Sequence, residues 1–441
     1  MPRTTLTVGE SIADYHAVTG RQRSSALVGS RRIGRFLITR LRRQKVGIGR
    51  PAACAIAALP PVTGRMTPGV RILYTVGARP NFIKMAPLIA ALRRRLPDAR
   101  HILVDTGQHY DRMMSEIFRE ELGMPAPEHV LRVGSGTHAV QTARVMERIE
   151  PVIEEERPDV VIVPGDVNST LAVALVAVKL GVPLAHLEAG LRSFDRRMPE
   201  EINRIVADEF SDLLFIHSSE AEANLLAEGI ATQRIHFVGN TMIDSLVAME
   251  ERFRGMQTAA ALGLRREDFL LVTLHRPALV DGSLLTEVMR ELSAIARELP
   301  VVFPVHPRTR RMIADKSAGS GLLLLDPIGY VEFLSLEADA TAVLTDSGGV
   351  QEETTYLGVP CFTLRDNTER PVTVRAGTNT LLGLDPSGIA RILPALAEPA
   401  PARTEPPPGW DGHAAERAAA VIAGAQIHAN GPRASAPAAP N

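Results

Sequence analysis

The sequence predicts an α/β protein with two doubly wound parallel sheets, and three observations lead to that prediction. From residue 70 onward, apolar segments alternate with helical patterns, which is typical of βαβ units. The alternation falls into two series that meet near residues 239–261. With 441 residues, of which 45% are hydrophobic, the chain is also long enough to bury two cores. A ligand would then bind in the cleft between two doubly wound domains.

The apolar segments give the expected strands, and the turns between them give the expected domain boundaries. In the first series the expected strands are 71–76, 101–105, 159–163, one without stated bounds inside 164–204, 213–217 and 235–238, with helices over 83–95 and 140–156. In the second series they are 269–273, 301–305, 322–325, 342–345 and 360–363. We therefore expect an N-terminal Rossmann-like domain over 66–240, a C-terminal one over 241–385, helices and a linker over 386–425, and a disordered tail over 426–441.

Composition excludes some classes of protein. No apolar run approaches the roughly 20 residues of a membrane span, and two cysteines, Cys54 and Cys361, are too few for a disulfide framework. We therefore expect a cytoplasmic protein with no membrane partner. Residues 1–65 hold eleven arginines and one lysine against two acids, so their net charge is +10. Because the whole chain has a net charge of −1, residues 66–441 have a net charge of −11. This arm has the composition of a nucleic-acid or lipid binder or of a transit peptide. We expect a disordered extension that binds no nucleic acid.

The stretch from Pro164 to Arg204 is the predicted centre of the chemistry. It places three carboxylates, Asp166, Glu188 and Glu200, just past strand ends or at a helix start. In an open α/β sheet, ligands bind at this edge. Glu200 has a second interpretation, because an acid in the first turn of a helix is also favourable for stability alone.

A second stretch, Thr345–Glu353, predicts a phosphate-binding loop. It follows a strand, contains Ser347, Gly348 and Gly349, and opens a helix whose free N–H groups suit an anion, although a tight turn would have the same pattern. Glu353 lies one turn into that helix, where a carboxylate could accept hydrogen bonds from a ribose diol. Basic and imidazole groups follow strands in both series and suggest a bound diphosphate: Arg79, Lys84, His275, Arg276, His306, Arg308 and Arg370.

The sequence shows no metal or dinucleotide signature. No His and Cys pair has zinc spacing, and neither GxxxxGK[ST] nor GxGxxG follows a strand. His138, His186 and His217 lack ligand partners nearby in the sequence, so we interpret them as structural. We expect no metal and no cofactor.

Nine segments in order resemble the motif series of the non-hydrolysing UDP-N-acetylglucosamine 2-epimerases. These segments are Gly77–Leu88, Thr106–Met114, Pro164–Thr170, His186–Ser193, Met198–Arg204, Val238–Asp244, Thr273–Pro277, Asp346–Glu353 and Glu369–Pro371. The resemblance covers about residues 70–385, and the segment at Trp410 is also similar. It implies a GT-B type fold with the UDP-sugar in the cleft, and a homodimer.

The resemblance also implies roles for individual residues. The catalytic positions would be Asp166, Glu188, Glu200 and His275. The substrate-binding positions would be Arg79, Lys84, Arg276, His306, Phe333, Ser347, Gly348, Gly349, Glu353 and Arg370. Gln108 and His109, together with His306, resemble positions near a second, regulatory site. The chain departs from the family where Ala78 and Asn81 replace the usual Thr and Glu beside Arg79, and where Pro277 and Ala278 follow His275-Arg276.

The implied reaction is reversible epimerisation at C2 of UDP-N-acetylglucosamine, giving UDP-N-acetylmannosamine. UDP leaves as the C2 proton is removed, and it adds back to a 2-acetamidoglucal with protonation from the other face. Two faces of a ring require two acid or base groups, and a dry cleft can raise carboxyl pKa values toward the working pH. Two alternatives use the same pocket: a hydrolysing epimerase, and a GT-B glycosyltransferase with a UDP-sugar donor.

Overall fold

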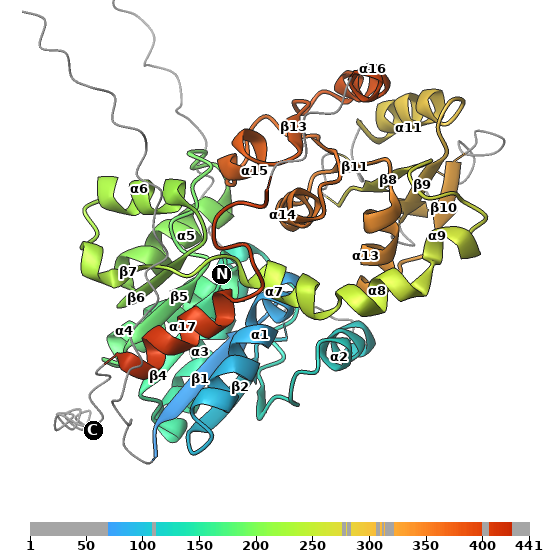
Figure 1. Ribbon diagram of the computed structural model, residues 1–441. Helices are drawn as coiled ribbons and strands as arrows, with labels where there is room; N and C mark the ends of the chain where they lie inside the picture. Colours follow the sequence, from blue (N-terminus) through green and yellow to red (C-terminus); the bar gives the residue numbers. More distant parts are fainter. Residues whose placement is uncertain are drawn as a thin grey trace, which may run out of the picture. The chain divides into compact units, whose positions relative to one another are not determined.

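The structure is a computed structural model that describes residues 69–107, 112–275, 284–305, 322–398 and 405–425, with the single residues 279, 309, 310 and 313. It contains two parallel sheets, one in each half of the described chain (Figure 1). The expectations for residues 1–65 and 426–441 lie outside the described residues. No helix in the described part combines the length and the apolar character that a membrane crossing requires.

The first sheet has seven strands in the order β3-β2-β1-β4-β5-β6-β7, and every pair is parallel. Its strands are β1 (Arg71–Val76), β2 (Arg100–Asp105), β3 (His129–Val130), β4 (Val160–Pro164), β5 (Leu184–Leu187), β6 (Leu213–Ile216) and β7 (Ile235–Phe237). The helices are α1 (Arg79–Arg95), α2 (Arg112–Glu121), α3 (His138–Glu156), α4 (Asn168–Lys179), α5 (Pro199–Phe210) and α6 (Ser219–Ala227). Helices α7 (Thr241–Ala248), α8 (Glu250–Met256) and α9 (Thr258–Ala261) lead to the second sheet.

The second sheet has six parallel strands in the order β10-β9-β8-β11-β12-β13. Its strands are β8 (Leu270–Thr273), β9 (Val301–Pro304), β10 (Leu322–Leu325), β11 (Ala342–Thr345), β12 (Cys361–Thr363) and β13 (Asn379–Leu381). The described helices are α11 (Leu284–Ile295), α13 (Tyr330–Asp339), α14 (Gly348–Leu357), α15 (Pro371–Arg375), α16 (Ile392–Ala397) and α17 (Ala414–Gly424).

Both sheets reverse their strand order at one point, which predicts where a ligand binds. In the first sheet the chain runs outward from β1 to β3 and then returns to place β4 on the other side of β1. The second sheet repeats this at β8 and β11. Crevices at such switch points, beyond the carboxyl ends of the strands, are where open α/β sheets bind ligands. The loops after β1, β4, β8 and β11 are therefore the structural candidates for a site.

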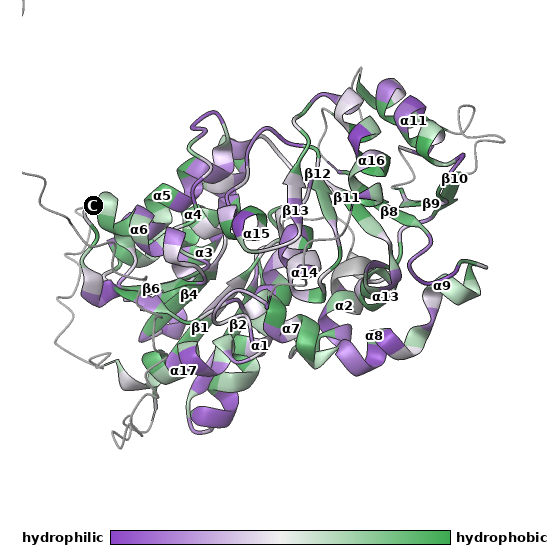
Figure 2. Ribbon diagram, turned by 45° about the horizontal axis from the view of Figure 1, so that its top comes forward, coloured by the Kyte–Doolittle hydropathy of each residue, from purple (hydrophilic) through white to green (hydrophobic). Residues whose placement is uncertain are grey.

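The strands of both sheets are apolar along most of their length, which fits sheets whose two faces are both buried. Strand β4 is buried along its whole length, and β1 and β8 are nearly so. The strands accordingly carry mostly hydrophobic colour in Figure 2, whereas α8 and α11 carry hydrophilic stretches. A strand buried on both faces reads as a continuous apolar run, as parallel sheets require.

The two halves of the described chain also share packing. A single apolar cluster contains Ile83 of α1, Leu246 of α7 and Leu271 of β8. Next to it, the Ser245 hydroxyl donates a hydrogen bond to the carbonyl of Ile83 at 2.6 Å. Helix α17 returns to the first half, where it packs beside α1 (Figure 1) and buries Ala418 and Ile422 in the core of the first sheet.

The sequence predicted most strands within one residue of their observed bounds but missed two. Strands β3 and β13 have only two and three residues, too short for a period-two pattern to appear. Helix α1 begins at Arg79, four residues before the expected start, because Pro80 is compatible with the first turn. In that turn Asn81 accepts hydrogen bonds from the N–H groups of Gly77 and Ala78 at 3.2 and 3.0 Å.

Candidate active site

Glu188 stands at the carboxyl end of β5 with an unusual backbone. Its φ is 71°, a left-handed conformation that costs a residue with a side chain about 1 to 3 kcal/mol. The strand fixes this geometry, since the N–H of Glu188 donates to the carbonyl of Phe215 at 3.1 Å. The residue is also 9% exposed. Strain retained at a buried carboxylate indicates a functional position.

Two cations from opposite halves of the chain hold the Glu188 carboxylate. Lys84 of α1 contacts Oε2, and Arg370 contacts Oε1. Burial alone would raise the pKa of Glu188, but the charges of Lys84 and Arg370 outweigh burial and lower the pKa to about 2. The expected rise of the carboxyl pKa therefore does not occur at this residue. Gly165 leaves room for this pair, because a Cβ there would lie 3.2 Å from the Lys84 ammonium.

Arg370 is the central cation of the second half. Besides Glu188, its Nε lies 2.9 Å from Glu352 and its Nη1 lies 3.4 Å from Glu369. Burial opposes its charge, yet these carboxylates raise its pKa above the ordinary arginine value. A Cβ on Gly348 would lie 2.4 Å from Arg370 Nη1. The glycine that the sequence assigned to a phosphate loop is therefore also needed by the arginine.

The loop itself has the form of an anion site. Ser347 is the N-cap residue of α14, and its hydroxyl makes no capping bond to the helix. The first N–H groups of a helix have no partner within the helix and attract negative charge. Gly349 allows close packing, since a Cβ there would meet the Met242 methyl group at 2.8 Å.

The other two predicted carboxylates occupy different environments. Asp166 follows β4 and accepts a hydrogen bond from Arg204 Nε at 2.9 Å. Arg204 also lies 3.4 Å from Glu369, so a chain of ion pairs connects Asp166 to Arg370. Glu200 lies in the first turn of α5 and is partly exposed, and within the described residues its carboxylate makes no hydrogen bond or ion pair.

His275 is held by a partner that the sequence analysis did not single out. Its Nδ1 lies 2.8 Å from Asp346 Oδ1, and its backbone N–H donates to Asp346 Oδ2 at 3.0 Å. The His275 side chain is 62% exposed while Asp346 is buried. The carboxylate thus fixes the ring and leaves the other nitrogen, Nε2, free to meet a ligand. The available signal in the sequence was that His275 and Asp346 each come just after a strand, β8 and β11, of the same expected sheet.

Arg79 and Glu353 form a separate part of the site. The Arg79 guanidinium lies over the Phe118 ring at 4.5 Å, a cation–π arrangement. Glu353 is buried in α14 and accepts a hydrogen bond from the Tyr330 hydroxyl at 2.6 Å. Burial raises the pKa of Glu353 to about 7, although Tyr330 and Arg79 oppose the shift. Phe333, on the same helix as Tyr330, is buried as well.

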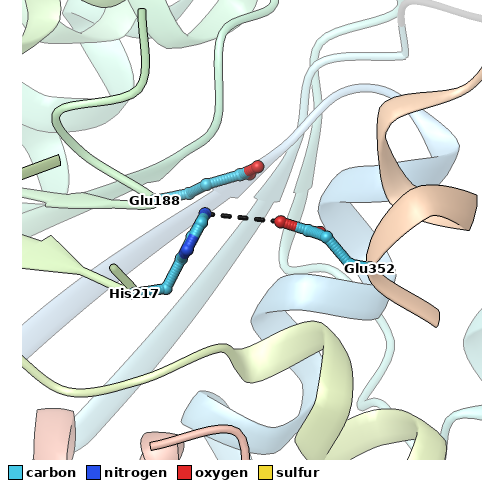
Figure 3. Close-up of side chains that lie close together, drawn as sticks. All are labelled: Glu188, His217 and Glu352. Carbon is cyan, nitrogen blue, oxygen red and sulfur yellow. Dashed lines mark ion pairs between the residues drawn. The ribbon is translucent and has the colours of Figure 1, made fainter. Parts of the chain in front are cut away.

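The three histidines that the sequence analysis interpreted as structural have different surroundings. His186 is structural as predicted, with ring nitrogens 2.7 Å from Asp208 and from the Gly165 carbonyl, and His138 bonds to Asn168. For His217 the role stays a prediction, but the structure places partners beside it that are close in space and distant in sequence. Its Nε2 lies 3.3 Å from Glu352 Oε1, and Glu188 points toward the same place (Figure 3).

Glu188, His217 and Glu352 offer ligand atoms within 4.8 Å of one another, which is a donor set that a metal ion can use. Lys84 and Arg370 already contact these carboxylates, and their charges would repel a divalent cation. The prediction that no metal is needed stays a prediction. Five other predicted residues lie outside the described residues: Gln108, His109, Arg276, His306 and Arg308.

Comparison with known proteins identifies the family. A family profile described as UDP-N-acetylglucosamine 2-epimerase matches residues 91–423. The chain is 42% identical over 331 residues to the UDP-N-acetylglucosamine 2-epimerase of Methanococcus maripaludis, an alignment that covers 72% of this chain and 89% of that protein. The chain belongs to the UDP-N-acetylglucosamine 2-epimerase family.

Two further relatives extend the comparison within the epimerase family. The UDP-2,3-diacetamido-2,3-dideoxy-D-glucuronate 2-epimerase of Pseudomonas aeruginosa is 45% identical over 319 residues, which cover 71% of this chain and 88% of that protein. The crystal structure of the Methanocaldococcus jannaschii UDP-GlcNAc 2-epimerase, in complex with UDP-GlcNAc and UDP, is 39% identical with a TM-score of 0.72. That match covers 80% of this chain and 99% of the other. The predicted family and the predicted GT-B type fold of this epimerase-family chain are thus confirmed.

Proposed function

We propose that the protein is a non-hydrolysing UDP-N-acetylglucosamine 2-epimerase. The observation that carries this proposal is Glu188, a buried and strained carboxylate held between Lys84 of the first half and Arg370 of the second. A base beside two cations suits a substrate whose reacting carbon lies next to a diphosphate. The cations match the diphosphate, and the carboxylate matches the weakly acidic C2–H.

The reaction balances without an external reactant. A carboxylate removes the C2 proton as the C1–O bond to UDP breaks, which gives a 2-acetamidoglucal and free UDP. UDP then adds back to C1 while a second acid delivers a proton to the opposite face of C2. No redox step occurs. The substrate supplies its own leaving group and nucleophile, so the protein contributes orientation, acid and base groups, and charge stabilisation.

The residues divide between the two ends of the substrate. Asp166, Glu188 and Glu200 act on the sugar, since they belong to strand ends and a helix start of the first sheet. Arg370 and the His275–Asp346 pair stabilise charge on the departing diphosphate. The Ser347–Gly349 loop, Glu353 and Phe333 hold the nucleotide, supported by the open N-terminus of α14.

The test is to incubate the purified protein with UDP-N-acetylglucosamine and resolve the products by NMR. UDP-N-acetylmannosamine at equilibrium with its substrate supports the proposal. Free N-acetylmannosamine with UDP would identify a hydrolysing epimerase. If the protein alone leaves the substrate unchanged and consumes it only after a sugar acceptor is added, it is a glycosyltransferase. A Glu188→Gln variant, checked for folding by circular dichroism, is the control for site-specific turnover.

Solvent exchange tests the two-carboxylate mechanism. In deuterated water the product should carry deuterium at C2, because carboxyl protons exchange with solvent. Product that fully retains hydrogen would contradict the mechanism and point to a shielded transfer by one group. The measurement is the intensity of the C2 proton signal during the first turnover.

A second sugar deserves a parallel assay because of one relative. The Pseudomonas aeruginosa protein, 45% identical, is named for UDP-2,3-diacetamido-2,3-dideoxy-D-glucuronate. Both substrates share UDP and a 2-acetamido group, and they differ at C3 and C6. Comparing kcat/KM for the two nucleotide sugars decides which of them this chain prefers.

The remaining parts of the proposal concern assembly and context. We propose a cytoplasmic homodimer that serves polysaccharide biosynthesis and binds UDP-N-acetylglucosamine and UDP, with neither nucleic acid nor membrane as a partner. Light scattering at assay concentration measures the oligomeric state. Because Lys84 and Arg370 already neutralise Glu188, EDTA should leave turnover unchanged. A loss that added Zn²⁺ or Mg²⁺ restores would show that the acidic cluster holds a metal.

A further inference from the structure

His217 is a buried imidazole to which the proposed reaction assigns no role. It follows β6 and is 2% exposed. Neither of its ring nitrogens has a hydrogen-bond partner of good geometry among the described residues. Buried polar groups are nearly always paired, so an imidazole of this kind calls for an explanation. The Trp410 ring packs against it edge-on, at 5.8 Å between centroids, and closes one side.

Charged groups from three other parts of the chain lie near the His217 ring. Glu352 of α14 lies 3.3 Å from Nε2, and Glu188 from the end of β5 lies on the same side. Figure 3 shows the three side chains pointing toward one another. Arg370, at the start of α15, contacts both carboxylates. Burial lowers the pKa of His217, and Arg370 adds to this, whereas Glu352 and Glu188 oppose it.

Among the described residues, the ion-pair network around this cluster contains one more carboxylate than cations. The linked carboxylates are Asp166, Glu188, Glu201, Glu352 and Glu369. The linked cations are Lys84, Arg204, Arg365 and Arg370. Five carboxylates against four cations leave −1 while His217 is neutral, and a proton on His217 would bring the network to zero.

A diphosphate at this site would change that balance. Arg370 is shared among three carboxylates, and an anionic ligand that engages its guanidinium draws it away from Glu352 and Glu188. Those two carboxylates would then be buried with less positive charge beside them, which costs free energy. Added negative charge also favours the protonated form of a nearby imidazole. His217 is the described group in contact with the cluster that can gain a positive charge.

We propose that His217 takes up a proton when the nucleotide diphosphate binds, and that its imidazolium replaces Arg370 as the partner of Glu352 and Glu188. The inference rests on the proposed function, because it assumes that UDP binds beside Arg370. The proton comes from solvent or buffer, forms an N–H bond on the ring nitrogen that carries the lone pair, and returns to solvent when UDP leaves. His217 is thus a positioning residue that acts through Glu188 and Arg370.

Calorimetry of UDP binding tests the inference directly. Titrations at pH 8 in phosphate and in Tris, buffers with different ionisation enthalpies, give the number of protons exchanged. The expected result is net uptake that approaches one proton per site, with an affinity that falls by up to about tenfold per pH unit above neutrality. His217→Gln should abolish the uptake and flatten this pH dependence. Above pH 7 the UDP phosphates are already ionised, so they contribute little to the slope.

Matched variants separate this role from a structural one. His236 is a half-buried imidazole on the neighbouring strand β7, and within the described part of the chain burial alone lowers its pKa. His236→Gln should therefore keep the proton uptake. If His217→Gln fails to fold, Glu352→Gln serves instead, because removing that carboxylate removes a group that favours the imidazolium. Uptake that persists in these cluster variants, or binding of UDP by the unmodified protein without uptake, overturns the inference. Absence of UDP binding overturns the proposed function as well.

Discussion

Glu200 and Glu201 are adjacent in the sequence, but their environments differ, which separates the proposed catalytic acid from a structural one. Glu201 is buried, and its carboxylate accepts hydrogen bonds from Ser193 N at 2.9 Å and from Phe194 N at 2.8 Å while it pairs with Arg204. Glu200 has no such partner within the described chain and is partly exposed. One acid is therefore built into the first half, and the other is free to meet a substrate.

Replacing each of these acids should give opposite results. Glu200→Gln should lower kcat by roughly 10² to 10⁴-fold, the contribution of a positioned acid or base, while stability changes by less than about 1 kcal/mol. Glu201→Gln should lower the free energy of unfolding by roughly 3 to 5 kcal/mol, because it breaks a buried ion pair. Steady-state kinetics and urea unfolding on both variants measure this. Full turnover in Glu200→Gln would leave that residue only a role at the helix start.

Glu353 should affect nucleotide binding and stability in a pH-dependent way. Burial raises the pKa of its carboxyl group to about 7 from the ordinary value of 4.5. A carboxyl group whose pKa is raised on folding contributes stability that is fully present below pH 4.5 and is lost as pH rises through about 7. Glu353→Gln should therefore unfold at higher urea than the unmodified protein at pH 8 but not at pH 4.5, and should bind UDP more weakly. Glu332→Gln, on the neighbouring helix α13, is the control. An unchanged UDP affinity would remove Glu353 from the nucleotide site.

At the scale of the element, the start of α14 combines two requirements. Its backbone must approach an anion, and its first residue must leave space for Arg370. Gly348 and Gly349 look equivalent in the sequence, yet a Cβ at 348 meets Arg370 Nη1 at 2.4 Å, whereas one at 349 meets the end of the flexible Met242 side chain at 2.8 Å.

Alanine at the two glycines should distinguish these requirements. Gly348→Ala should displace the Arg370 guanidinium and lower kcat/KM by roughly 10²-fold, as a misplacement of about 1 Å can do. Gly349→Ala should cost much less, since the Met242 methyl group can move aside. Kinetics with UDP-N-acetylglucosamine and the melting temperature of each variant measure the effects. Equal losses in both variants would mean that the backbone approach to the anion, and not Arg370, sets the requirement.

At the scale of the whole molecule, the network of ion pairs makes stability depend on pH. The pKa of Glu188 is lowered to about 2, because Lys84 and Arg370 outweigh burial there. The pKa of Glu369 falls further below its usual range, because burial is outweighed by neighbouring arginines, chiefly Arg365. A carboxyl group whose pKa is lowered on folding contributes stability that is present above its pKa in the unfolded chain, about 4.5. This stability is lost as pH falls through its pKa in the folded protein.

Acid unfolding should therefore be steep between about pH 4.5 and 2. The chain has one tryptophan, Trp410, whose ring packs on His217 and whose Nε1–H donates to the His217 carbonyl at 3.0 Å. Its fluorescence reports on the region where the C-terminal segment returns to the first half. Arg370→Met should move the acid transition to higher pH, because Glu188 and Glu352 lose their compensating charge. A transition that stays at the same pH would show that other groups control acid stability.

The sequence by itself determined the alternation of strands and helices, the two parallel sheets, and the residue types at their carboxyl ends. These follow from local patterns, since apolar runs, glycine turns and helix starts are encoded within a few neighbouring residues. The motif series was likewise sufficient for the family. Strands β3 and β13 were missed because two or three residues carry no periodicity.

Only the tertiary structure decided which of those residues meet. Glu188 and Arg370 lie 182 positions apart, and their contact depends on how the two halves pack through α7. His217 looked structural, yet the fold brings it to Glu352 and Glu188. Asp346 likewise reaches His275 only because β8 and β11 are neighbouring strands. Charge pairing and burial depend on distances in space, and these distances set the pKa values from which the chemistry follows.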